Sequence, residues 1–122
     1  MRLLRPVLLF SVAALLIVPA ASAIEINEIR IDQPGTDNDE YVELAGSPGE
    51  SLAGVWLVTI GDGTGGSGVV ETAFDLSAYS IQADGIFMAA EDSWTGTCGT
   101  ADALVGTSLN FENSDNLTFL LV

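Results

Sequence analysis

The sequence has no histidine and no lysine, and arginine occurs only at Arg2, Arg5 and Arg30. The common general bases and the groups that activate nucleophiles are therefore missing, which leaves only carboxylates for acid–base work. Zinc usually takes His and Cys ligands, which argues against a zinc site. A glycosidase would need two carboxylates facing a sugar cleft, and a domain of this size has little room for one. We expect no enzyme, no catalytic residues and no bound cofactor other than weakly held calcium.

Positive charge is almost absent, whereas Asp and Glu together number 17, so the net charge is −14. A surface of this sign repels phosphate backbones and anionic lipid headgroups, which argues against nucleic acid as a partner. Cys98 is the only cysteine, so no internal disulfide can form. We expect Cys98 to pair with a downstream cysteine or to be buried. Residues 116–122 end on a strand pattern, which suggests an N-terminal fragment of a longer protein.

The first 23 residues have the features of a secretory signal peptide. Arg2 and Arg5 precede an apolar run at 7–18, and Ala21-Ser22-Ala23 forms a small-residue cleavage site. The alternative is a membrane anchor, but a spanning helix needs about 20 apolar residues and this run is shorter. We predict cleavage after Ala23, with a secreted, cell-surface or periplasmic product that is not inserted in the membrane. One domain, residues 24–122, remains.

The mature part has several short β-type runs separated by Gly, Pro, Asn and Asp. In residues 24–31 the apolar alternation slips by one position at Asn27-Glu28, which predicts a β-bulge with the Asn27 side chain bonded to nearby backbone. Residues 55–60 are apolar on both faces, which predicts a central strand covered on both sides. The pattern favours an all-β sandwich. The predicted strands are 24–31, 40–45, 55–60, 69–76, 86–90, a short one near Leu104, and 117–122.

The order Ile-Asn-Glu-Ile, Asp-Glu-Tyr-Val-Glu-Leu and Leu-Ala-Gly-Val-Trp-Leu resembles the lamin-tail domain family. The matching positions are Ile26, Asn27, Glu28, Ile29, Glu40, Tyr41, Glu43, Leu44, Leu52, Gly54 and Trp56. The resemblance implies an immunoglobulin-like antiparallel β-sandwich, here incomplete at its C-terminus. Bacterial members are exported, acidic modules that often accompany secreted nucleases, phosphoesterases or surface proteins. The matching residues are structural, and we expect Trp56 to fill the core between the sheets.

Two loops have the composition of ligand sites. Asp32, Asp37 and Asp39 place three carboxylates on one loop, and such hard oxygen ligands suit Ca²⁺. The EF-hand spacing is absent, so a solvated turn is the alternative. Residues 61–66 satisfy G-x-G-x-x-G, but a dinucleotide site needs a helix after the glycines. The residues that follow are poor helix formers, so we predict a hairpin loop there.

Two functions follow from these patterns. The first is a non-catalytic exported β-sandwich module that binds a protein, an envelope glycan or another part of the cell surface, stiffened by calcium. The second is the N-terminal accessory domain of a larger secreted hydrolase such as a nuclease or phosphoesterase. Metal-binding residues beyond Val122 would distinguish the second from the first.

Overall fold

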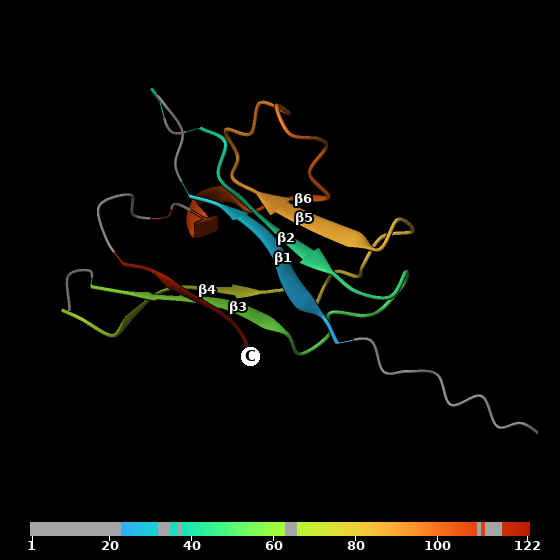
Figure 1. Ribbon diagram of the computed structural model, residues 1–122, viewed down its shortest axis with the longest axis horizontal. Coiled ribbons are helices and arrows are strands. Elements are labelled where there is room, and N and C mark those ends of the chain that lie inside the picture. The colour runs from blue at the N-terminus through green and yellow to red at the C-terminus, as the bar shows by residue number, and fades with distance from the viewer. Residues whose placement is uncertain (1–22, 32–34, 37, 63–65, 110, 112–115) are drawn as a thin grey trace, which may run out of the picture.

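The computed structural model describes residues 23–31, 35, 36, 38–62, 66–109, 111 and 116–122 (Figure 1). Residues 1–22 of the predicted signal peptide therefore lie outside the described residues. In the described part, no helix is long and apolar enough to cross a membrane.

Seven strands form two sheets, and no α-helix occurs in the residues that the structure describes. The strand order is β1-β2-β5-β6 in the first sheet and β4-β3-β7 in the second. All pairs are antiparallel except β5 with β6. The elements are β1 (Glu25–Arg30), β2 (Tyr41–Ala45), β3 (Trp56–Gly61), β4 (Val69–Asp75), β5 (Ile86–Ala90), β6 (Ala103–Leu104), a 3-10 turn η1 (Gly106–Leu109) and β7 (Thr118–Leu121). The all-β prediction and all seven predicted strands are confirmed.

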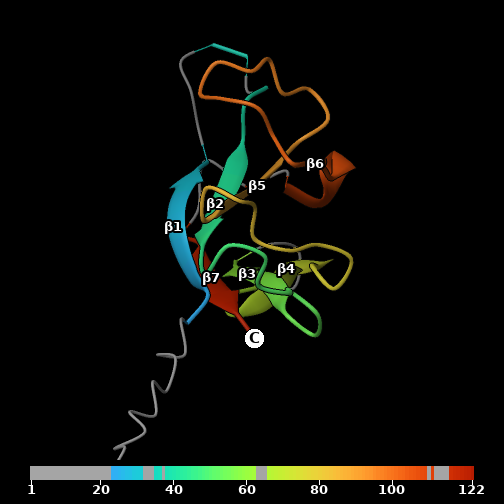
Figure 2. The same ribbon diagram turned by 90° about the vertical axis from the view of Figure 1, so that its right-hand side faces the viewer.

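The two sheets lie one above the other and share a single hydrophobic core (Figure 2). Leu44 and Phe87 from the first sheet and Leu57 from the second are each fully buried in it. The Phe87 ring lies 5.0 Å from the ring of Tyr79, in the segment that leads to β5. Burying one such side chain contributes roughly 1.5–3 kcal/mol, so contacts across the layers are the main stabilising term.

The phase slip in the first strand is a bulge, as predicted. The pairing of β1 with β2 shifts between Ile26 and Glu28, and both Ile26 and Ile29 pack against the core. The prediction that the Asn27 side chain bonds to nearby backbone is wrong, because its amide donates to the Glu43 carboxylate on β2. The bulge turns Asn27 out of the alternation, so it reaches across to the neighbouring strand.

Strand β3 is covered on one face only, which corrects the prediction of a doubly covered strand. Leu57 and Thr59 face the core and are buried. Trp56 lies on the opposite face and is 40% exposed, so the prediction that it fills the core is wrong. Apolar residues on both faces of a strand are typical of two covering layers. Among the described residues, only the inner layer exists.

The glycine-rich stretch joins two antiparallel strands, as the hairpin prediction requires. β3 ends at Gly61, and Val69 opens β4, which pairs with it. A strand therefore follows the glycines where a dinucleotide site would need a helix. Residues 63–65 lie outside the described residues.

Candidate functional site

A long loop, residues 91–102, covers the outer face of the first sheet. Trp94 and Ala101 from this loop pack on a small cluster of Tyr41, Met88 and Ala90. The rings of Tyr41 and Trp94 meet edge to face with centroids 5.4 Å apart, a favourable aromatic geometry. The cluster points away from the main core because these side chains alternate with the core residues along β2 and β5.

Asp39, just before β2, anchors this loop. Its carboxylate accepts hydrogen bonds from the Thr95 amide at 2.7 Å, from the Thr95 hydroxyl at 2.7 and 2.8 Å, and from the Thr97 hydroxyl at 3.0 Å. Asp39 is only 6% exposed. The bonds from Thr95, helped by Thr97, lower the pKa of Asp39 below its usual value, against the opposing effect of burial.

The lowered pKa of Asp39 predicts acid-sensitive anchoring of the loop. A carboxyl whose pKa is depressed on folding adds stability above its unfolded pKa, and that contribution is lost as the pH falls through the folded value. We expect the melting temperature of wild type to fall more steeply in acid than that of the Asp39→Asn variant. Equal slopes in a pH series of melting curves would contradict the anchoring role.

The calcium prediction named Asp32, Asp37 and Asp39, of which the first two lie outside the described residues. Asp39 turns its carboxylate to the threonine donors of the 91–102 loop. Within the described residues, no group of three or more His, Cys, Asp or Glu side chains could hold a metal ion. The threonine contacts join residues more than fifty positions apart, so the local sequence carried no signal for them.

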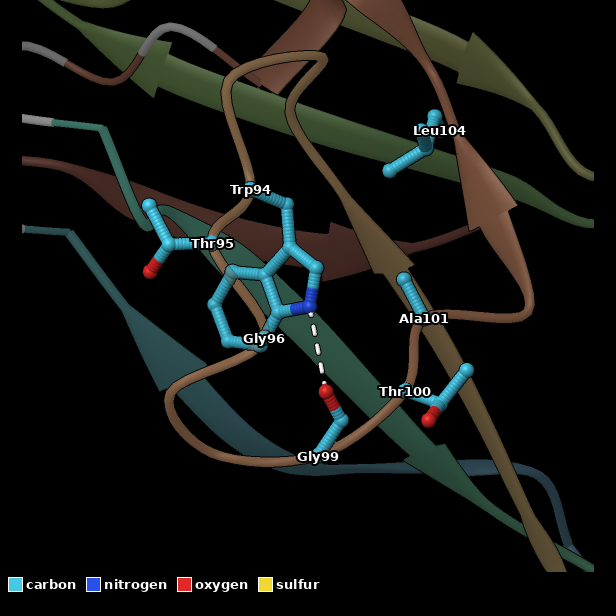
Figure 3. Close-up of a pocket in the computed structure, with 7 residues that line it drawn as sticks. All are labelled: Trp94, Thr95, Gly96, Gly99, Thr100, Ala101 and Leu104. Carbon is cyan, nitrogen blue, oxygen red and sulfur yellow. Dashed lines mark hydrogen bonds between the residues drawn. The ribbon is translucent and has the colours of Figure 1, made fainter.

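Beside Trp94 the loop forms a shallow, open depression of about 300 Å³ (Figure 3). The indole N–H donates to the Gly99 carbonyl at 3.2 Å, which closes the loop around the ring. The depression is lined by Trp94, Thr95, Gly96, Gly99, Thr100, Ala101 and Leu104, none of which has an acidic or basic side chain. Such a surface can offer an aromatic ring, hydroxyls and backbone groups, which are means of binding and not of acid–base chemistry.

Two reactive-looking side chains near this loop take part in structural contacts. The Tyr41 hydroxyl donates to Glu28 at 2.6 Å, and burial, followed by that bond, raises the pKa of Tyr41, so it remains protonated. Cys98 is exposed, which corrects the expectation of a buried thiol. Its sulfur accepts a hydrogen bond from an Arg30 guanidinium N–H at 3.3 Å.

The outer face of the second sheet, in contrast, presents apolar side chains directly to solvent. Trp56 is 40% exposed, Val70 56%, Leu120 37% and Val122 65%. We call these four residues the Trp56 face. They are neighbours across strands. The backbones of Trp56 and Val122 exchange hydrogen bonds of 2.9 and 3.0 Å. Further along the same face of β3, Leu120 pairs with Val58 and Val70 pairs with Ile60. Isolated exposed apolar residues are ordinary, but a contiguous group is typical of an interaction site.

Comparison with known proteins found no matching family model, no similar characterised protein and no similar solved structure. The function is therefore argued from the geometry of the two sheet faces.

Proposed function

We propose that this protein is an exported, non-catalytic β-sandwich module of the immunoglobulin-like, lamin-tail type, which binds a protein or an envelope glycan at the cell surface. The observation that carries the binding role is the Trp56 face, an exposed apolar surface on an otherwise acidic chain. Exposing such side chains to water is unfavourable, and a partner that covers them recovers that free energy.

The strand order supports the immunoglobulin-like part of the proposal. Sandwiches of that type place strands A, B and E in one sheet and C, F and G in the other, with an extra strand beside C in the variable type. Strands β1, β2 and β5 lie in the positions of A, B and E. Strands β4, β3 and β7 lie in those of the extra strand, C and F. The departure is β6, which is short and parallel to β5.

The non-catalytic part of the proposal is supported by the chemistry of both surfaces. The depression beside Trp94 is lined by uncharged side chains, and the Trp56 face is made of Trp, Val and Leu. Neither set contains an acidic or basic side chain that could transfer a proton or activate a threonine hydroxyl of the depression.

A binding assay with isolated cell envelopes tests the function. We expect the Trp56→Thr/Leu120→Thr double variant to bind at least about tenfold more weakly than wild type, because each change removes apolar contact area and threonine keeps the preference for a strand. Leu104→Thr is the matched variant of the other surface, since Leu104 is 57% exposed, lies on β6 in the other sheet and lines the depression beside Trp94; it should keep wild-type binding if the Trp56 face carries the function. Equal binding by all three proteins would remove the Trp56 face from the function.

The proposal includes stiffening by calcium at the loop that carries Asp32, Asp37 and Asp39. Asp39 is the member of the set with a defined place, next to the 91–102 loop. Millimolar Ca²⁺ is expected to raise the melting temperature, and Asp39→Asn to reduce the rise. Identical melting curves in calcium and in chelator would end this part of the proposal.

A further inference from the structure

We infer that the partner of the Trp56 face is a protein segment whose apolar centre is flanked by lysine or arginine side chains. This inference rests on the proposed binding role of that face and specifies the chemistry of its partner. It follows from the charges around the face and from the area that the face can bury.

A negative charge, the Asp75 carboxylate, lies beside the Trp56 face. Asp75 lies directly opposite Trp56 in the β3–β4 pairing, and its side chain is exposed. Its carboxylate accepts a hydrogen bond of 2.8 Å from the Ser77 amide, and bonds from Ser77 lower the pKa of Asp75. Asp75 is therefore charged at neutral pH. An anionic group next to an exposed indole favours a partner that brings a cation to the edge of an apolar contact.

No positive charge of the chain itself can meet that carboxylate from the same sheet. No lysine, arginine or histidine follows Arg30 in the sequence, and Arg30 lies on β1 in the first sheet. The second sheet therefore contributes carboxylates and apolar groups but no cation. A cation that pairs with Asp75 in a complex would therefore come from the partner.

A second copy of the chain fits the face poorly. Each copy has a net charge of −14, so two copies repel each other and bring no cation to Asp75. The area is also small: four side chains that are between 37% and 65% exposed supply on the order of 400 Å². A stable interface buries about 800 Å² per partner. An anionic membrane surface is disfavoured by the same charge.

Three synthetic peptides test the inference, each with a central run of valines flanked at both ends by lysines, by serines or by glutamates. The valines can cover the Trp56 face while the flanking residues reach Asp75, which pairs with Trp56. We expect the lysine peptide to bind the full chain at least about tenfold tighter than the serine peptide, with affinity falling as salt rises, and the glutamate peptide not to bind. Asp75→Asn should weaken binding of the lysine peptide several-fold and leave binding of the serine peptide unchanged.

The control variants separate contact at the face from general attraction to an acidic protein. Trp56→Thr/Leu120→Thr should lose most binding of the lysine peptide, whereas Leu104→Thr should retain it. Binding that is equal in all three proteins, or no binding of the lysine peptide at all, would overturn the inference. Equal, Trp56-dependent binding of the serine and lysine peptides would overturn the inference and leave the proposed function intact. Sedimentation experiments could instead show that the wild-type protein is a dimer and that the double variant is a monomer. That result would identify a second copy as the occupant of the Trp56 face and would also overturn the inference.

Discussion

Phe87→Ala is expected to lower the free energy of unfolding by about 3–5 kcal/mol, the usual cost of removing a buried phenylalanine. Phe87 is completely buried between the sheets and its ring packs against Tyr79 at 5.0 Å. It also lies on β5 opposite Leu44, another fully buried side chain of the same core. The cavity left by the missing ring would open at the centre of the contact between the two sheets, where the surrounding strands can collapse least.

Trp56→Ala is the matched control for this prediction, since tryptophan is larger than phenylalanine. Its cost should be smaller than that of Phe87→Ala, because 40% of the Trp56 side chain is already in water whereas Phe87 is fully buried. Chemical denaturation of both variants gives the two values. A cost for Trp56→Ala equal to that for Phe87→Ala would place Trp56 in the core and contradict the fold described above.

Glu40→Ala is the second change with a large expected effect, a loss of about 1–3 kcal/mol from the free energy of unfolding. Glu40 is 2% exposed, and one of its carboxylate oxygens accepts a hydrogen bond of 2.8 Å from the buried Phe111 amide. Its own amide donates to the Glu91 carboxylate at 3.0 Å. Glu40 thus joins the start of β2 to two distant segments, and alanine would leave the Phe111 amide with the Leu109 carbonyl, at 2.9 Å, as its remaining acceptor.

Glu40→Gln distinguishes the hydrogen bond from the charge. Glutamine keeps an oxygen that can accept from the Phe111 amide, so we expect a smaller loss of stability than with alanine. Amide hydrogen exchange at Phe111 should accelerate strongly in Glu40→Ala and only slightly in Glu40→Gln. Unchanged exchange in both variants would show that the bond does not protect this amide.

The strands were predictable from the sequence because their evidence is local. The phase slip between Ile26 and Ile29 is visible in the letters, and the pairing of β1 with β2 contains the bulge that it requires. The turn before β5 also depends on local chemistry: Gly85 adopts a positive φ of 91°, which glycine tolerates best, and the Asp84 carboxylate accepts from the Ile86 amide at 3.1 Å.

The candidate sites were harder to predict because they depend on contacts between distant residues. The bonds from Thr95 and Thr97 to Asp39 span more than fifty positions and leave no periodic trace. Trp56 illustrates the second difficulty. Alternation identifies which residues share a face of a strand, but it cannot tell a face covered by a second layer from one left in solvent. The apolar residues on both faces of β3 therefore fit two explanations, a second covering layer or an apolar face in solvent, and the second is the Trp56 face.

The exposure of Trp56 is the claim on which the binding role depends, and tryptophan fluorescence measures it most directly. Trp94→Phe leaves Trp56 as the only tryptophan of the chain. Acrylamide is an uncharged quencher, so the acidic surface does not keep it away from the indole. We expect the folded protein to emit at a longer wavelength than a buried indole does, and acrylamide to quench that emission before the protein unfolds, because 40% of the side chain is in water. Short-wavelength emission that resists acrylamide until the protein unfolds would show Trp56 to be buried and would contradict the account.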